Sequence, residues 1–348
     1  FNTAVGYKAL TAQTGTSGET SNTAVGYQAA VALTIGRYNV VIGKNALQTD
    51  DTGDSTVAIG QNTFQLQNSA TTDTNQSTGN TGVGYQVAPY NITGKQNTLI
   101  GFQAGLGASS YSHSANTAVG FEALLDIRTG GDNVAVGYKA AENLRTGGSN
   151  ICIGTGVAAT MTDVSNSILI GAAAGDAINN DDCNGTVGIG HNALGALTSG
   201  SGNTAVGYQA GAANSTGIEN TIVGYQAHDV GVGDGNTAIG KAAMGSMTHA
   251  TSDKNVAIGA YSLLSTGANA CVGVVAIGYE ALLEQTSADS NTAVGYRAGQ
   301  NLTTGTNNTF LGFNSGLGIT GTKLTGHNNT CVGKQSGYVL QGAATSNT

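Results

Sequence analysis

Nineteen near-copies of one short motif run through this chain, and no other feature restricts its fold so strongly. The first copy is Asn2-Thr3-Ala4-Val5-Gly6-Tyr7-Lys8-Ala9, and the last complete copy begins at Asn329. Ten of the eighteen intervals between successive motif glycines are 17 residues long, and the others span 16 to 24. A short, nearly fixed period is typical of solenoids, in which each repeat forms one coil that stacks on its neighbours.

We number the positions of each repeat from its motif glycine, so that position −1 precedes the glycine and position +1 follows it. The motif glycines are Gly6, Gly26, Gly43, Gly60, Gly84, Gly101, Gly120, Gly137, Gly154, Gly171, Gly190, Gly207, Gly224, Gly240, Gly259, Gly278, Gly295, Gly312 and Gly333.

The residues just before the glycine predict a short β-strand. Position −1 is Val, Ile or Leu and position −3 is Thr, Val or Ile in every repeat, and the two positions share one face of a strand. Because β-branched side chains suit a packed, pleated surface, we expect this face to line the coil interior. Position −2 is mostly Ala and lies on the opposite face. We therefore expect the alanine face to be the interface of an oligomer, which would also support a thin coil with a small core.

The motif glycine and the Asn at position −4 predict a corner. Glycine is the residue required where φ is positive or where another backbone passes close by. Asn tolerates turns, and stacked asparagines would form a hydrogen-bonded ladder from coil to coil. On this view Gly207→Val should weaken the coil, whereas Gly217→Asn, in the second half of the same repeat, should be mild.

The second half of the repeat is less regular. In eight of the ten 17-residue repeats another glycine stands at position +10, often with an apolar residue such as Leu33, Ile127 or Leu144 at position +7. This pattern predicts a second short strand with one inward anchor, followed by a turn. The extra residues of longer repeats fall in this half, for example between Gln65 and Gly79, as expected for loops. The predicted fold is all-β: a parallel β-roll or β-solenoid of about nineteen coils of 16 to 24 residues, in one repetitive segment, 1–348.

Composition excludes several classes of partner. The net charge is −8 and only 9% of residues are charged, so no basic run exists to neutralise the phosphates of a nucleic acid. No apolar stretch approaches the ~20 residues of a membrane-spanning helix. The cysteines lack any CxxC spacing, and Cys152 and Cys331 replace Ala at position −2, which indicates small buried thiols. The last residues, Ser346-Asn347-Thr348, open a twentieth repeat, so we expect a segment of a longer fibrous chain.

Position +1 is aromatic in eleven repeats and is the candidate contact site. If exposed, this stripe could stack on the sugar rings of a cell-surface glycan; the structural alternative, which we favour, is an aromatic ladder at a subunit interface or over a corner. His191 takes the place of the aromatic residue in its own repeat. The eleven residues are Tyr7, Tyr27, Tyr85, Phe102, Phe121, Tyr138, Tyr208, Tyr225, Tyr279, Tyr296 and Phe313.

Catalytic and metal sites are not indicated. Acidic clusters at Asp50–Asp54 and Asn179–Asp182 could supply calcium ligands, but solvated turn acids are the favoured interpretation. The acids at positions 122, 126, 132, 142, 280 and 284 form no evident pair for glycoside cleavage. The histidines at 113, 191, 228, 249 and 327 share no ligand spacing. We therefore predict no enzyme, no cofactor and no metal. An ice-binding face is also disfavoured, because the motif places Thr beside a Val that we expect to be buried.

The motif resembles known families. Asn203-Thr204-Ala205-Val206-Gly207-Tyr208-Gln209-Ala210 is similar to repeats in bacteriophage tail-fibre proteins, and Asn255-Val256-Ala257-Ile258-Gly259 resembles the head repeat of trimeric autotransporter adhesins. The resemblance extends over nearly the whole chain. It implies left-handed parallel β-rolls that assemble as homotrimers and bind host surfaces through a glycan or protein receptor.

Tyr-Gln-Ala after the glycine and the 17-residue period favour the phage family. We therefore expect the shaft of a virion tail fibre that contributes to host attachment. The alternative is a bacterial surface adhesin or extracellular filament, and a glycan-depolymerising tailspike is a minor one.

Overall fold

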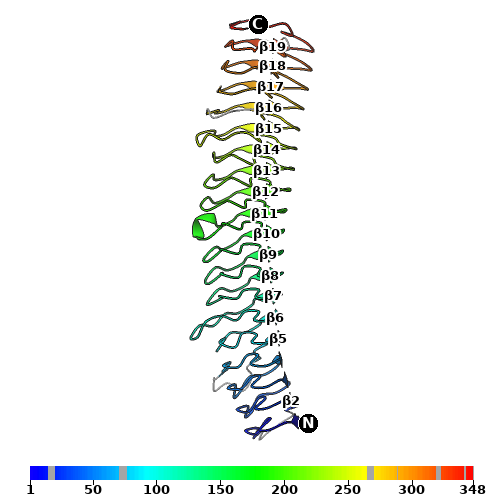
Figure 1. The fold of residues 1–348 in the computed structure, drawn as a ribbon, viewed down its shortest axis with the longest axis vertical. Helices are drawn as coiled ribbons and strands as arrows, with labels where there is room; N and C mark the ends of the chain where they lie inside the picture. Colours follow the sequence, from blue (N-terminus) through cyan, green and yellow to red (C-terminus); the bar gives the residue numbers. More distant parts are fainter. Residues whose placement is uncertain are drawn as a thin grey trace. The chain divides into compact units, whose positions relative to one another are not determined.

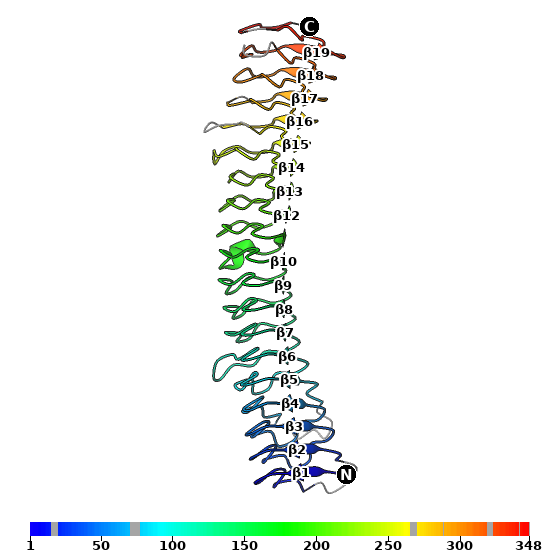
Figure 2. The ribbon, with the colours of Figure 1, turned by 45° about the vertical axis from the view of Figure 1, so that its right-hand side comes forward.

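The computed structural model shows an all-β parallel solenoid with almost no helix, as the sequence predicts (Figures 1 and 2). The structure describes residues 1–14, 20–69, 77–264, 270–287, 289–318, 323–340 and 342–347. Much of the predicted insertion between Gln65 and Gly79 and the final Thr348 lie outside these ranges. The helical content of the described part is one 3-10 turn, η1 (Asp181–Cys183), and no helix there is long and apolar enough to cross a membrane.

Each described repeat contributes one three-residue strand that ends directly before its motif glycine. The strands are β1 (Thr3–Val5), β2 (Thr23–Val25), β3 (Val40–Ile42), β4 (Val57–Ile59), β5 (Thr81–Val83), β6 (Thr98–Ile100), β7 (Thr117–Val119), β8 (Val134–Val136), β9 (Ile151–Ile153), β10 (Ile168–Ile170), β11 (Val187–Ile189), β12 (Thr204–Val206), β13 (Thr221–Val223), β14 (Thr237–Ile239), β15 (Val256–Ile258), β16 (Val275–Ile277), β17 (Thr292–Val294), β18 (Thr309–Leu311) and β19 (Thr330–Val332).

The chain forms two compact units, Phe1–Ala172 with Asn179–Asp181, and Ala173–Ile178 with Asp182–Thr348. In the first unit β1 to β10 pair in chain order, each parallel to the next. In the second unit β11 to β19 do the same. Equivalent strand positions face each other throughout each ladder, so each strand position becomes a column of side chains.

The strand faces are the reverse of those predicted. In β2 to β19 the central residue, position −2, is buried, whereas positions −1 and −3 are half-buried or exposed. Ala58, Ala118 and Ala205 are fully buried inside the coil. The expectation that the alanine face forms a subunit interface is therefore wrong, as is the assignment of the β-branched face to the interior.

Packing between positions −2 and +4 explains this reversal. The two positions share the core, and in most coils a large side chain at one stands with a small residue at the other. A Cβ atom added to Gly82, at position −2, would lie 2.7 Å from Phe64, at position +4 of the preceding coil. Conversely, a Cβ on Gly105, at position +4, would lie 2.9 Å from Leu99, at position −2. The opposite wall of a thin coil thus fills the interior and leaves room mainly for Ala on the strand.

The motif glycines occupy tight corners. Their φ angles lie far in the positive region, for example +133° at Gly43 and +141° at Gly207. A Cβ on Gly43 would also lie 2.6 Å from the carbonyl oxygen of Gly60 in the next coil. Both reasons for a glycine, positive φ and close approach of a backbone, therefore apply at this corner.

The asparagine ladder is confirmed. The backbone N–H of Asn39 and its Nδ2 both donate to Oδ1 of Asn22, at 2.9 and 3.1 Å, and the same Nδ2 donates to the carbonyl oxygen of Gly53 at 2.8 Å. The pattern continues through Asn116, Asn133 and Asn150. These side chains are fully or almost fully buried, so amide groups within the core join consecutive coils wherever the ladder runs; it is interrupted where position −4 is Thr56, Ser167, Thr186 or Val274.

The second half of the repeat differs from the prediction in two ways. The anchors at +7, such as Leu33, are buried, but the described residues form no second strand there, only isolated bridges such as Asp54 to Ser77. Turns dominate this half, although its backbone still bonds to the next coil. In addition, a Cβ on Gly217 would lie 2.5 Å from the carbonyl oxygen of Gly233, so Gly217→Asn is not expected to be mild.

Candidate functional site

The outward strand face forms an apolar strip in each unit. Its members, positions −1 and −3, are β-branched or aliphatic and carry no charge in any repeat. Ile42, Ile100 and Leu311 are 38%, 39% and 45% exposed. Repeated apolar exposure of this kind is typical of a protein interface. The residue at position −1, often Val, is therefore on the surface, and its expected burial is no argument against an ice-binding face. Position −1 is never Thr, however, so the strip lacks the Thr-x-Thr rows of such a face.

The aromatic residues at position +1 are also on the surface, where they form stacked columns. In the first unit one run joins Tyr7 to Tyr27 and another joins Tyr85, Phe102, Phe121 and Tyr138. In the second unit the runs are His191, Tyr208 and Tyr225, and Tyr279, Tyr296 and Phe313. Ring centroids lie 5.1 to 5.4 Å apart with interplanar angles of 6 to 17°.

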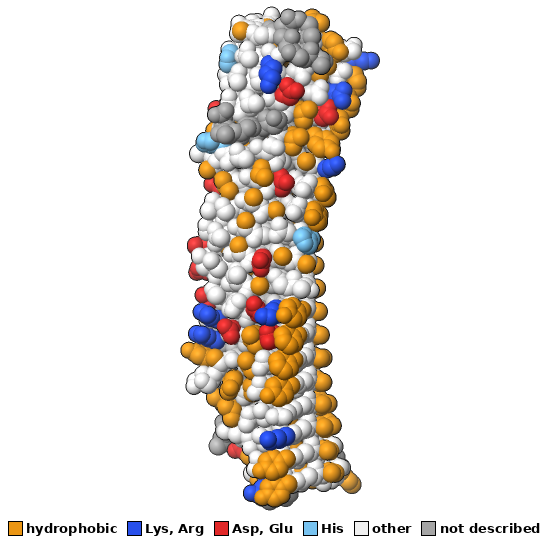
Figure 3. Space-filling model, viewed as in Figure 1, with side chains coloured by type: hydrophobic (Ala, Val, Ile, Leu, Met, Phe, Trp, Pro, Cys, Tyr) orange, Lys and Arg blue, Asp and Glu red, His pale blue; other side chains and the backbone are white. Residues whose placement is uncertain are grey.

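Stacking limits what these rings can bind. Inside a run, both faces of a ring are covered by its neighbours, so the exposed part is the ring edge and, for Tyr, the hydroxyl group. Phe121 and Tyr138 are still 40% and 51% exposed. A sugar could therefore lie on a ring face only at the end of a run, and along the run it would meet edges and hydroxyl groups. Figure 3 shows hydrophobic side chains gathered in rows on one face, with few charged side chains among them.

Cations accompany several of these rings. The Nζ atom of Lys139 lies 5.9 Å from the ring centroid of Tyr138, and that of Lys334 lies 5.8 Å from the centroid of Phe313. These distances suit cation–π attraction, which strengthens when water is excluded. The aromatic columns are thus uncharged but bordered by Lys and Arg at a few points.

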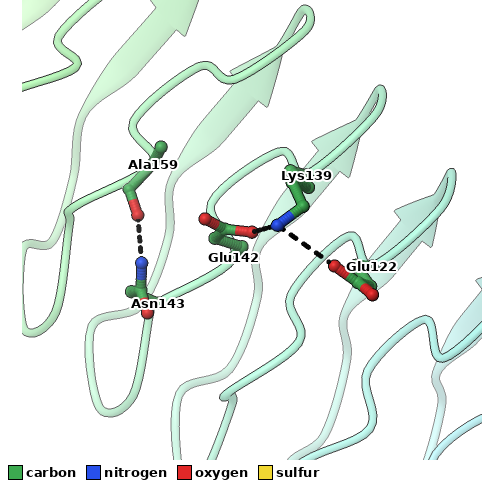
Figure 4. Close-up of polar contacts among 5 residues, drawn as sticks. All are labelled: Glu122, Lys139, Glu142, Asn143 and Ala159. Carbon is green, nitrogen blue, oxygen red and sulfur yellow. Dashed lines mark hydrogen bonds and ion pairs between the residues drawn. The ribbon is translucent and has the colours of Figure 1, made fainter.

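Coil stacking brings together acids that the sequence leaves scattered. The Nζ atom of Lys139 lies 3.3 Å from Glu122 and 2.9 Å from Glu142, so two carboxylates share one ammonium group (Figure 4). Hydrogen bonding to Glu142 and then to Glu122 raises the pKa of Lys139 to about 12. Position +2 of consecutive coils also pairs Glu280 with Arg297 at 2.8 Å. Acid at +2 followed by a base at +2 one coil later is the signal that would have predicted both pairs.

The first acidic cluster is structural. Asp50 is fully buried, contrary to the expectation of a solvated turn acid. Its carboxylate accepts hydrogen bonds from the backbone N–H of Gly53 at 3.0 Å, from Nε2 of Gln67 at 2.8 Å and from Oγ of Ser69 at 3.0 Å. Asp50 stands at position +7, where other coils carry an apolar anchor, and it replaces that anchor with a hydrogen-bonded network.

Four thiols and two imidazoles are buried. All four cysteines are free and buried, and burial raises the pKa of the Cys152 thiol to about 12. His113 and His228 are buried as well, and burial lowers the pKa of each to about 4. Within the described ranges, no group of three or more His, Cys, Asp or Glu side chains could hold a metal ion.

Each unit therefore presents two features suited to contact with other molecules, the apolar strip of positions −1 and −3 and the aromatic columns of position +1. Both run from coil to coil because equivalent positions are aligned in the strand ladders. No protein-family model matches the chain, and neither does any curated protein sequence.

Proposed function

We propose that this chain is a structural protein, the shaft segment of a bacteriophage tail fibre, in which three parallel copies associate through the apolar strip. The observation that carries the proposal is the exposure of uncharged, mostly β-branched side chains at positions −1 and −3 in coil after coil. A soluble chain rarely leaves such a surface uncovered.

A second and third copy of the same chain are the occupants that fit this strip best. The strip has no charged group that would repel an identical copy, and copies aligned in register would bring equivalent coils together along its length. Closed, cyclic assembly is the usual arrangement of identical subunits. Position −2 is unavailable for this purpose because its alanines are buried within the coil.

In this proposal the function is mechanical, and the chain is not an enzyme. Parallel strand ladders and the buried asparagine ladder join the coils of each unit. The aromatic columns would contribute to host attachment through a surface glycan or protein receptor. The proposed location is the tail fibre of the virion.

The mass of the purified chain in solution tests the assembly. Light scattering and intact-complex mass spectrometry are expected to give three times 34.5 kDa. The double variant Val206→Lys/Val223→Lys places charges in the strip and should yield monomers. Its control, Thr198→Lys/Thr216→Lys, adds the same charge at exposed positions in the second halves of two consecutive coils, those of Gly190 and Gly207, and should leave the trimer intact. A monomeric wild-type chain would overturn the assembly.

Labelling tests the location. Antibodies against the chain are expected to decorate the tail fibres of virus particles in electron micrographs. Decoration confined to a bacterial surface would instead favour the adhesin, which has the same coil and the same strip.

A further inference from the structure

Two arginines occupy the same place in consecutive coils of the first unit. Arg128 and Arg145 both stand at position +8, and the backbone N–H of Arg128 donates to the carbonyl oxygen of Arg145 at 2.9 Å. Their side chains therefore leave the backbone on adjacent rungs, about 4.8 Å apart, as in neighbouring strands. Positive charges carried on adjacent rungs repel each other, and an anion bound near both would offset that repulsion.

No residue that the structure describes supplies that anion. Among the described residues, ion pairs involve Lys139 and Arg297, and no carboxylate oxygen lies within 4.0 Å of either Arg128 or Arg145. The Nε atom of each arginine is buried without a hydrogen-bond partner. The nearby carboxylate of Asp163 instead accepts a hydrogen bond from Oγ1 of Thr146 at 2.6 Å.

An aromatic residue supports one side of the pair. The guanidinium carbon of Arg128 lies 5.4 Å from the ring centroid of Tyr111, which is itself 42% exposed. Stacking on an aromatic face holds a guanidinium group in one plane and leaves its edge free to donate. Exposed hydroxyl groups of Thr129 and Thr146 follow the two arginines directly in the sequence.

We propose that Arg128, Arg145 and Tyr111 form a binding site for an oxyanion, a carboxylate or a sulfate, carried by an acidic polysaccharide. A guanidinium fork donates two parallel hydrogen bonds to such a group, and two forks one rung apart can hold one oxyanion between them. The neighbouring hydroxyl groups suit the hydroxyl groups of the sugar. If the chain is a tail-fibre shaft, an acidic polysaccharide bound at this site would be its receptor on the host surface. The site depends on the proposed function only for this cellular setting.

A polysaccharide fits the surroundings better than a nucleic acid does. The equivalent position in the next two coils is Thr162 and Asn179, so the basic track ends after two rungs. A polynucleotide carries a phosphate at every nucleotide and needs a longer basic groove. With a net charge of −8, the chain would repel so dense a polyanion, whereas spaced acidic sugars would meet the two arginines beside one carboxylate, that of Asp163, which already accepts a hydrogen bond from Thr146.

Binding of defined polymers to the purified full chain tests the site. The probes are hyaluronan, which carries a carboxylate on every second sugar, keratan sulfate, which carries sulfates, neutral dextran and duplex DNA. The wild-type chain should bind at least one of the two acidic polysaccharides and not the neutral one. Arg128→Gln/Arg145→Gln should weaken that binding at least tenfold, and Arg128→Lys/Arg145→Lys, which keeps charge but loses the fork, should weaken it less.

A charge-matched control separates a site from bulk electrostatics. Lys254→Gln/Lys323→Gln removes two exposed positive charges elsewhere and should leave binding within twofold of wild type. Equal loss in both double variants would overturn the site, as would absence of binding to both acidic polysaccharides. Stronger binding to DNA than to either polysaccharide would also overturn it.

Measuring mass and polymer binding on the same samples distinguishes failure of the binding site from failure of the trimeric shaft. A monomer that binds the acidic polymer would overturn the trimeric shaft and leave the site standing. A trimer that binds neither polymer would overturn the site and leave the shaft standing.

Discussion

Gly316 and Phe310 fill one volume of the core. A Cβ atom added to Gly316 would lie 2.6 Å from Cγ of Phe310, which is the largest residue found at position −2. Elsewhere the same two positions hold the opposite combination, as in Ala276 with Leu282, and both of those residues are fully buried. In these coils a large side chain on the strand stands with a small residue at position +4, or the reverse; Ile222 with His228, both fully buried, is an exception.

This relationship predicts rescue of one variant by another. Gly316→Leu alone should lower the free energy of unfolding by about 3 kcal/mol through overpacking, and Phe310→Ala alone by about 4 kcal/mol through a cavity. The double variant reproduces the Ala276 and Leu282 combination and should recover more than half of the summed loss. Denaturant unfolding of the four proteins measures the coupling, and strictly additive losses would contradict shared packing.

The motif glycine should be intolerant of side chains. Gly207 has φ of +141°, a region open essentially to glycine alone, and its Cβ would overlap the carbonyl oxygen of Gly224. Gly207→Val should cost at least about 2 kcal/mol. It should also speed hydrogen exchange at the N–H of Gly224, which donates to Val206. The control is Gly185→Asn, where φ is +72° and no atom lies within 4 Å of the added Cβ, and it should stay near wild type.

The asparagine ladder should be sensitive to the loss of one rung. Asn133→Ala leaves the N–H and Nδ2 of Asn150 without their acceptor and the carbonyl oxygen of Gly147 without a donor, all within the core. We expect a loss of about 3 kcal/mol, because each unpaired buried polar group costs about 1 to 3 kcal/mol. Asn133→Ser, which mimics Ser167 in the same column, should cost less. Asn143→Ala, near the surface, should cost under about 1 kcal/mol, and thermal melting that ranks it above Asn133→Ala would refute the ladder's role.

Acid should weaken the core through its buried histidines. Burial lowers the pKa of His228 to about 4, and both ring nitrogens lack hydrogen-bond partners. Between pH 6.5 and 4 the unfolded chain binds a proton that the folded chain excludes, so stability falls as pH is lowered through this window, by up to about 3 kcal/mol. His228→Leu should remove this part of the pH dependence and raise stability at neutral pH, while the part due to His113 remains. Parallel stability profiles for wild type and variant between pH 7 and 4 would contradict this account.

Replacing a non-glycine residue that has a left-handed backbone conformation by glycine should stabilise the protein. Ser149, at position −5, is exposed and has φ of +60°, and the same position is glycine at Gly202 and Gly235. Ser149→Gly should therefore raise the free energy of unfolding by up to about 1 kcal/mol, since L-residues pay roughly 1 to 2 kcal/mol in this region. Thr129→Gly, exposed but not left-handed, should lower stability instead. Equal effects of the two glycines on the melting temperature would exclude backbone relief as the cause.

The spacing of apolar residues does not show which strand face is buried, and the one further pattern in the sequence that bears on it becomes interpretable only once the coil is known. Alternation places positions −1 and −3 on one face and −2 on the other, but it does not say which face is inside. The missing signal is the pairing of a large residue at −2 with a glycine six residues later, as in Leu99 with Gly105 and Phe310 with Gly316. Such pairs indicate that −2 and +4 meet in the core.

The sequence by itself determined the period, the coil, the corner glycine and the asparagine ladder, because each depends on a local backbone need that recurs in every repeat. Only the tertiary structure decided which strand face is buried, since that depends on the volume that the opposite wall of the coil fills. It also decided which distant residues become neighbours, as with the charges of Glu122 and Lys139 or the backbones of Arg128 and Arg145, because stacking aligns residues 17 apart in the chain. Apolar β-branched residues at the surface are the consequence, and they direct the search for function to the outer face of the coil.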